Sequence, residues 1–255
     1  MATDKSSSWA FAIPSFGLLL VIWWVITNFG VISTAYLPTP LQVWSEFVSS
    51  LEKGTLLANL GISLARLLGT YVVASLLGIG AGVAMGLSPN VSRFFRPILS
   101  FFNAISGITW IPFALLWFGL GTPTIAFVIF NSVFFIIAQN TMTGVQTVPE
   151  VFEQGMLTMG AGRLRIIWEA LLPGALPSIV TGQRLALGFG WRGLIAAEMV
   201  AGSVGIGFMI YNGSYDYRPD VVLMGILVVG VVATLMDQLV FAPLERRTIE
   251  RWGLV

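Results

Sequence analysis

From Pro97 to Pro149 the chain carries no charged residue. This stretch is too long for one membrane crossing, which takes about 20 residues, and the turn residues 119–123 divide it. Only 10% of all residues are charged, against about 25% in soluble domains. Lipid imposes such a composition because an ion at the bilayer centre costs roughly 2.5–3.5 kcal/mol or more. The sequence therefore predicts an all-α membrane protein that crosses the bilayer repeatedly.

Six apolar segments are long enough to be transmembrane helices. They cover residues 9–29, 67–87, 98–118, 124–146, 179–202 and 221–240. Pro112 predicts a kink in the third segment, and the residues 203–220 read as a loop. A cleaved signal peptide is the alternative for the first segment, but its apolar part would be only about 7–15 residues long. We see no internal repeat and expect one transmembrane domain over residues 1–255.

Three glycines in the second segment, Gly78, Gly82 and Gly86, form two overlapping GxxxG spacings. Small residues four apart let helix backbones approach closely in lipid. Two interpretations follow: packing inside the chain, or a face used for dimerisation or gating.

Cysteine and histidine are both absent. Their absence excludes disulfides, Cys/His metal sites, nucleophilic pairs with histidine, and histidine proton relays. The net charge of +1 provides no basic patch for nucleic acid. We expect no metal or cofactor on this chain.

Polar residues inside the predicted spans are candidates for a translocation path: Arg192, Glu198, Asn131 and Asn140. Arg192 lies too deep for its head to reach the surface, whereas Arg184, near the start of its span, can do so. Arg192 and Glu198 are six positions apart, on different helix faces, so we do not expect them to pair. Structural hydrogen bonds and ion pairs between helices are the alternative role for all four.

The segment 147–178 is too polar to cross the membrane. Thr147 and Glu150 have the spacing of a capping box, which predicts that a short helix begins there. Gly160 and the two residues after it predict a helix stop and a turn. A second amphipathic helix follows, and we expect it to end at two prolines, Pro173 and Pro177.

Six spans place both termini on one side of the membrane, and the basic residues indicate which side. With the termini inside, the inner loops and tails contain Lys5, Arg93, Arg96, Arg163, Arg165, Arg246, Arg247 and Arg251. The outer loops contain Lys53 and Arg218, leaving aside Arg66 at the border of the second span. The segment 147–178 is therefore predicted to face the cytoplasm, and the chain to lie in the plasma membrane, which is the inner membrane in bacteria.

A cytoplasmic two-helix loop before the fifth of six spans resembles the EAA loop of ABC importer permeases. With the register anchored on Leu172-Pro173, the family glycine falls on Gly160. The family EAA falls on Gln154-Gly155-Met156, so glutamine stands where the family has glutamate, with Glu153 beside it. Further strings resemble the nitrate/sulfonate/taurine branch of the family: residues 37–40 (LPTP), 63–66 (SLAR), 117–121 (WFGLG), 197–199 (AEM) and 205–207 (GIG).

The resemblance implies a type I ABC importer permease that acts as a homodimer. Its implied partners are two ATPase subunits, which carry ATP and Mg²⁺, and an extracytoplasmic solute-binding protein. Alternating access would import a small, anionic solute such as nitrate, a sulfonate, taurine or bicarbonate, and Arg192 could guide it. The residues expected to couple the loop to the ATPase are Phe152, Glu153, Gln154, Gly155, Met156, Met159, Gly160, Arg163 and Pro173.

Three alternatives remain open from the residues alone. The two-helix loop could rest on lipid headgroups, and the chain could be a secondary transporter or channel that needs no ATPase. The third is a membrane-embedded enzyme built on carboxylates such as Glu198 or Asp237. Because the chain contains no G-x-x-x-x-G-K-[ST] phosphate loop, an energy supply from ATP would have to come from a partner.

Overall fold

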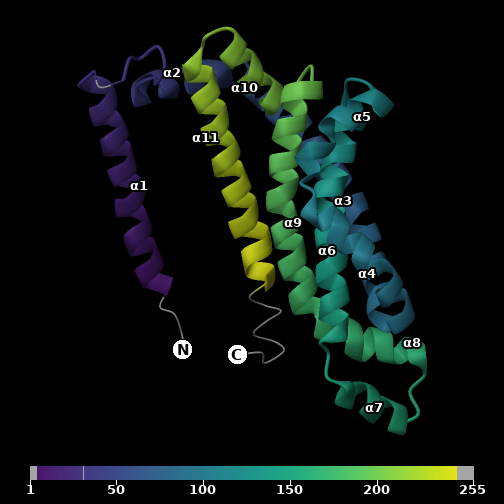
Figure 1. Ribbon diagram of the computed structural model, residues 1–255. Coiled ribbons are helices and arrows are strands. Elements are labelled where there is room, and N and C mark those ends of the chain that lie inside the picture. The colour runs from purple at the N-terminus through teal and green to yellow at the C-terminus, as the bar shows by residue number, and fades with distance from the viewer. Residues whose placement is uncertain (1–4, 31, 246–255) are drawn as a thin grey trace.

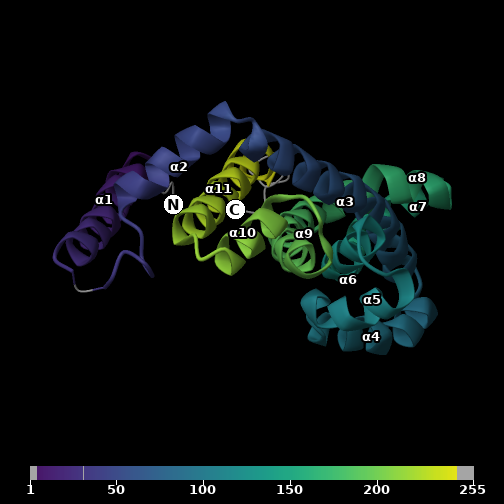
Figure 2. The ribbon, with the colours of Figure 1, turned by 90° about the horizontal axis from the view of Figure 1, so that it is seen from above.

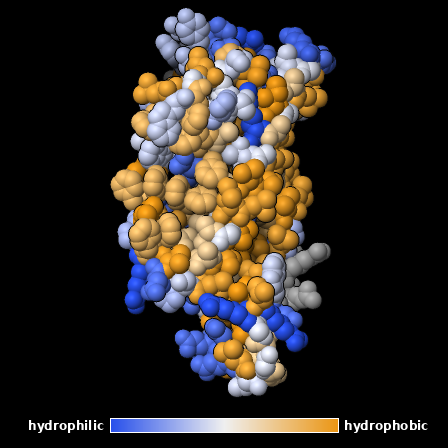
Figure 3. All heavy atoms as spheres, turned by 90° about the vertical axis from the view of Figure 1, so that its right-hand side faces the viewer, coloured by the Kyte–Doolittle hydropathy of each residue, from blue (hydrophilic) through white to orange (hydrophobic). Residues whose placement is uncertain are grey.

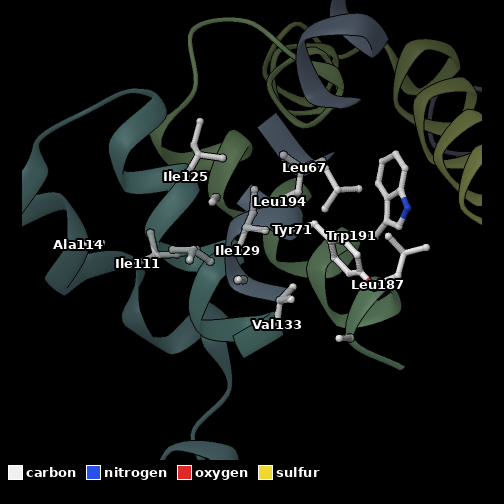
Figure 4. Packing of buried hydrophobic residues seen from close by; sticks show 14 of the residues in the cluster. Leu67, Tyr71, Ile111, Ala114, Ile125, Ile129, Val133, Leu187, Trp191 and Leu194 are labelled. Atoms are coloured by element: carbon white, nitrogen blue, oxygen red, sulfur yellow. The ribbon is translucent and has the colours of Figure 1, made fainter. Parts of the chain in front are cut away.

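The computed structural model describes residues 5–30 and 32–245, and within them it contains helices and connecting turns but no strands (Figure 1). The bundle is centred on α6 (Thr122–Gln146), which packs most extensively against α3 (Thr55–Leu87) and α9 (Leu172–Ala201). Figure 4 shows the core that these helices share with α5 (Ile111–Phe118), where Leu67, Ile129 and Leu194 are fully buried.

The α3 glycines lie against α6 of the same chain. A methyl group on Gly82 would approach Cβ of Thr141 to 2.5 Å, and one on Gly86 would approach Cβ of Val145 to 2.6 Å. Gly78 makes a similar close contact with Ile137. Of the two interpretations of the GxxxG spacings, the structure therefore supports packing inside the chain.

The predicted third span is not one helix with a kink at Pro112. It consists of α4 (Pro89–Ala104), the short η1 (Gly107–Trp110) and α5, and the chain bends by 86° between α4 and η1. Pro112 lies in the first turn of α5, where a missing N–H costs little, so it begins a helix instead of bending one. The bend falls at Ile105 and Ser106, whose backbone is extended.

The prediction that Pro173 and Pro177 end a short helix is wrong. Helical structure continues from α8 (Arg163–Ile166) through the π-helical turn η2 (Ile167–Leu171) into α9, and Pro177 lies inside α9. The π-helical turn explains how the helix passes Pro173, which has no N–H to donate. Its wider i→i+5 hydrogen bonding relaxes the backbone just before this proline. Figure 1 shows α8 lying across the lower end of the bundle before α9 rises.

The first helix stands apart from the bundle. Figure 2, seen from above, shows α1 (Lys5–Asn28) at one edge, joined to the rest through α2 (Pro40–Glu52). Trp23 Nε1 donates to the carbonyl oxygen of Pro38 (2.9 Å), which ties α1 to the segment just before α2. Thr39 and Gln42 form a capping box at the start of α2.

The region 203–220 is not a plain loop, because it contains α10 (Ile206–Tyr215). It leads into α11 (Pro219–Met236), which continues through the π-helical turn η3 (Asp237–Phe241). Arg218 joins these elements to α2, since its Nη2 contacts carboxylate oxygens of Asp220 (2.8 Å) and Glu46 (2.6 Å). Hydrogen bonds to these two carboxylates raise the pKa of Arg218 above its ordinary value.

Four helical stretches in the described residues are long and apolar enough to cross a membrane: 55–87, 122–146, 163–201 and 219–245. The bent pair of α4 with η1 and α5 would make a fifth. In α1 the described apolar part is shorter, residues 14–28, so the count of six spans stays a prediction. Figure 3 shows a broad hydrophobic band across the middle of the face in view, with hydrophilic residues gathered mainly at its two ends.

Candidate functional site

The loop at the lower end of the bundle is built around a positive-φ glycine. The helix α7 ends at Thr158 (Glu150–Thr158), and Gly160, two residues later, has a φ of +79°. The N–H of Gly160 donates to the oxygen of Leu157, and the N–H of Ala161 donates to the oxygen of Met156 (3.0 Å each). These two bonds form a Schellman motif, which reverses the chain toward α8.

The predicted capping box at Thr147 and Glu150 is absent from the structure. Thr147 instead ends α6, where its Oγ1 donates to the carbonyl oxygen of Gly144 (3.0 Å), and Pro149 is the N-cap of α7. Glu150 and Glu153 lie in the first turn of α7, where negative charge complements the helix dipole.

The loop carries apolar side chains that face outward. Phe152 is 60% exposed, Met159 is 78% exposed, and Leu164 and Trp168 are exposed as well. Phe152 and Met156 also line a groove of about 450 Å³ between α7 and the start of α9. A methyl group on Gly155 or Gly160 would meet no atom within 4 Å, so both backbones are open to a partner. Of the other loop candidates, Glu153, Gln154 and Arg163 are exposed and Pro173 is half-buried.

At the other end of the bundle, a buried ion pair joins α3 to α9. Glu198 is fully buried, and its Oε1 accepts from Arg66 Nη1 at 2.9 Å. Ser63 Oγ donates to the same carboxylate, at 2.8 Å from Oε2. The N–H of Gly207 also donates to Oε2 (3.0 Å), and the N–H of Ile206 donates to Ser63 Oγ (2.9 Å). Glu198, on α9, is thus held by partners from two other helices, α3 and α10.

Gly205, just before α10, and Gly207, in its first turn, pack closely against Glu198 and its helix. A methyl group on Gly205, whose φ is +123°, would lie 2.3 Å from Oε1 of Glu198. A methyl group on Gly207 would lie 2.6 Å from the carbonyl oxygen of Ile195. Three of the sequence strings that resemble the importer family, SLAR, AEM and GIG, therefore meet at one network. A fourth lies close by, since the N–H of Gly121 donates to the carbonyl oxygen of Ala201 (2.8 Å).

Arg192 lies on a different face of α9 from Glu198, and the two do not pair. Its guanidinium sits 5.3 Å from the ring centre of Phe189, and it forms no ion pair with any residue in the described ranges. Arg192 and Phe189 line two pockets. One, of about 370 Å³, reaches the α4–η1 bend with Asn103, Ser106 and Asn131, and the other, of about 350 Å³, extends toward Asp237.

The remaining polar candidates differ in their surroundings. Asn131 lines the pocket at the α4–η1 bend, and its Nδ2 donates to the oxygen of Phe127 (3.2 Å) on its own helix. Asn140 lies in the contact between α6 and α9, because a methyl group on Gly182 would approach its Cβ to 2.5 Å. Its Nδ2 bonds to the oxygen of Ile136 (2.8 Å), which fits a packing role better than a path.

Two features of the site are absent from the sequence prediction. Arg184 forms ion pairs, since its Nε contacts Asp237 (2.6 Å) and its Nη1 contacts Glu245 (2.5 Å) on the last helical stretch. The roles of Ser63 and Arg66 were also missed. The sequence did contain a signal for Arg66. An arginine at the edge of an apolar span must either pair with another residue or extend to the membrane surface.

Comparison with known sequences now places the chain in a family. The family described as "Binding-protein-dependent transport system inner membrane component" matches residues 74–249. The relatives include proteins named as permeases for taurine, aliphatic sulfonates, nitrate and bicarbonate transport. The chain belongs to this family, and it is the membrane-spanning permease component of an ABC importer, not an enzyme.

Two relatives illustrate the similarity. The taurine transport system permease protein TauC of Escherichia coli (strain K12) is 35% identical over 92% of this chain and 87% of its own length. The bicarbonate transport system permease protein CmpB of Synechococcus elongatus (strain ATCC 33912 / PCC 7942 / FACHB-805) is 31% identical, with coverage of 95% and 89%.

A solved structure shows the same fold. An inward-facing conformation of the MetNI methionine ABC transporter superposes with a TM-score of 0.67, at 20% identity, over 77% of this chain and 97% of that one. The all-helical architecture is therefore that of a type I ABC importer permease, and the chain is a multi-pass membrane protein.

Proposed function

We propose that this permease imports a small anionic solute by ATP-driven alternating access at the interface of a homodimer. Two ATPase subunits, which carry ATP and Mg²⁺, would dock at the loops formed by α7 and α8, and a solute-binding protein would deliver the solute from outside. The chain itself binds no cofactor. The relatives transport taurine, sulfonates, nitrate or bicarbonate, which supports an anion without specifying which one.

The observation that carries the anion proposal is Arg192. It lies eight residues beyond Arg184, which is about 12 Å further along α9 at 1.5 Å per residue. A guanidinium at membrane depth without a carboxylate is costly unless water or an anion meets it. The adjoining pocket adds the hydroxyl of Ser106 and the amides of Asn103 and Asn131. Arginine's forked donors suit sulfonate, nitrate and bicarbonate oxygens, so we assign Arg192 to anion passage and Asn131 to the same wall.

The structure of the loop supports the docking proposal. Exposed Phe152 and Met159 flank a turn whose backbone is fixed by the Schellman motif of Gly160. A rigid turn with apolar side chains on a short helix can fit into a partner's groove and transmit rigid-body motion. Because glutamine stands at position 154, docking would rest on the shape of the loop more than on one carboxylate.

The orientation follows from where charges gather. Figure 1 places the start of α1 and the end of α11 at the same end of the bundle as α7 and α8. That end holds Arg93, Arg163 and Arg165, so by the positive-inside rule we propose that it faces the cytoplasm, together with the start of α1 and the end of α11.

Reconstitution tests the proposal against a secondary transporter or channel. The permease would be placed in liposomes with and without its ATPase and binding protein, and taurine, nitrate and bicarbonate uptake would be measured. We expect uptake of one anion that requires ATP and the ATPase. Uptake driven by a solute or ion gradient without the ATPase would overturn the proposal.

A further inference from the structure

We propose that a basic pocket at the start of α4 binds the phosphate headgroup of an anionic phospholipid. This α4 pocket has a volume of about 340 Å³ and lies where the ends of α3 and α6 meet the start of α4. It is lined by Gly86, Pro89, Ser92, Arg93, Arg96 and Gln146.

The charge in the α4 pocket is not neutralised within the described ranges, 5–30 and 32–245. Arg93 and Arg96 are exposed, form no ion pair there, and lie three positions apart, on one face of the helix. The first turn of α4 contains no acidic residue. Two guanidinium groups that share a pocket without a carboxylate offer forked donors to a phosphate.

A short hydrogen-bond chain holds one of these arginines in place. Arg96 Nη2 donates to Oε1 of Gln146 (3.2 Å), and Nε2 of Gln146 donates to Ser92 Oγ (3.0 Å). Ser92 is buried, so this chain anchors Arg96 to the protein while leaving its other N–H groups available. The pocket is therefore partly organised before any ligand arrives.

Apolar side chains on α4 distinguish a lipid from a free phosphate ion. Phe94 is 69% exposed, and Ile98 and Phe101, four and seven positions further on, are also exposed. This spacing forms an apolar stripe along one face of α4. The stripe begins one residue after Arg93 and is turned from it by about 100° around the helix. A phospholipid held by Arg93 has acyl chains that can extend around the helix to this apolar face, whereas a free phosphate ion has none.

The position of the α4 pocket fits a headgroup. It lies next to the last residues of α3, a helix apolar enough to span, and at the end of the bundle where α7 and α8 lie (Figure 1). In the orientation proposed above, this is the cytoplasmic leaflet, which carries negative lipid charge. Only the choice of leaflet rests on that orientation, since binding itself requires neither transport nor the ATPase.

Lipid titration of the full-length chain in a non-ionic detergent tests the proposal. Isothermal titration calorimetry would compare dihexanoyl phosphatidylglycerol, phosphatidylcholine with the same chains, and inorganic phosphate. We expect phosphatidylglycerol to bind more tightly than the other two. Arg93→Gln should weaken it about fivefold, and the double variant Arg93→Gln/Arg96→Gln about 25-fold, from about 1 kcal/mol per basic residue near an anionic lipid.

Two control variants separate this site from general charge attraction and from an ion site. Arg163→Gln removes the same charge from the same end of the molecule and should leave phosphatidylglycerol binding unchanged. Phe94→Gln should weaken phosphatidylglycerol but not phosphate. Equal binding of the two lipids, or an equal loss with Arg163→Gln, would overturn the proposal. Phosphate binding as tight as the lipid's and unaffected by Phe94→Gln would replace it with a free-anion site.

Discussion

Two charged residues on α9, six positions apart, lie in opposite environments. Glu198 is fully buried and accepts hydrogen bonds from Arg66, Ser63 and the backbone of Gly207. Arg192 faces a pocket, rests on the ring of Phe189, and has no carboxylate partner among the described residues. Both were candidates for a translocation path, and we propose that role for Arg192 alone.

The difference separates charges that hold the fold from charges that remain available to a solute. A buried charge whose hydrogen bonds are all made inside the chain has no donor or acceptor to spare. An unpaired charge at membrane depth must be compensated by something outside the chain. The account therefore predicts that variants of Glu198 lose stability, while variants of Arg192 lose transport and keep their fold.

The largest expected effect is on stability. Glu198→Ala leaves Arg66 partly buried without its partner, and breaking such a pair costs about 3–5 kcal/mol. Unfolding of the purified permease in detergent would measure the change. Glu150→Ala, at an exposed position, is the control and should change stability by less than about 0.5 kcal/mol. If Glu198→Ala were as stable as the control, the ion pair would not be structural.

A double-mutant cycle sharpens that result. Arg66→Ala/Glu198→Ala should lose less stability than the sum of the two single variants, with a coupling of about 0.5–3 kcal/mol between residues in contact. Additive losses would show that the two side chains act independently.

A smaller effect is expected at the opposite end of the bundle, in the loop of α7 and α8. There the important feature is the backbone conformation of a turn and not an ion pair. Gly160→Leu forces a side chain into a positive φ, at a cost of about 1–2 kcal/mol, and should disturb the turn that presents Phe152 and Met159. We expect weaker co-purification of the ATPase with little loss of the membrane helices by circular dichroism. Gly162→Leu is the matched control, since its φ is −73° and its surroundings are equally open. Equal ATPase recovery from the two variants would remove Gly160 from docking.

The smallest effect is expected at the other arginine of α9. Arg184 is paired with Asp237 and Glu245, but its side chain remains 35% exposed, so solvent weakens the pair. Arg184→Gln should cost at most about 1 kcal/mol in unfolding measurements and leave transport within about twofold of the wild type. A loss of transport as large as that of an Arg192 variant would end the distinction between paired and unpaired arginines.

The sequence was sufficient for the architecture and for the local signals within it. Charge-free stretches can only be apolar helices in lipid, and Gly160 supplied the turn that the loop needs. Pro173 and Pro177 misled the prediction because a π-turn next to Pro173 lets the helix continue. Pro112 had the opposite effect: it predicted a bend where the helix only begins. The bend lies instead at Ile105 and Ser106, where there is no proline.

The contacts between distant residues could not be predicted in the same way. Ser63 and Glu198 are 135 positions apart, and no periodicity in either segment indicates that they meet. The helix α10 was likewise hidden, since its first residues are held by side chains of α3 and α9. Family strings marked these segments as similar to known permeases but did not show that they form one network.

The central claim is that Arg192 meets the transported anion. The most direct measurement is the initial rate of taurine uptake by the Arg192→Gln permease, reconstituted with its ATPase and binding protein. Arg184→Gln is the control, and the same assay is repeated with nitrate and with bicarbonate. Losing charge-assisted hydrogen bonds worth about 1.5–3 kcal/mol predicts about 10–150-fold slower uptake of the transported anion, while ATP hydrolysis stimulated by the binding protein continues. Uptake by Arg192→Gln equal to that of the wild type would contradict the account.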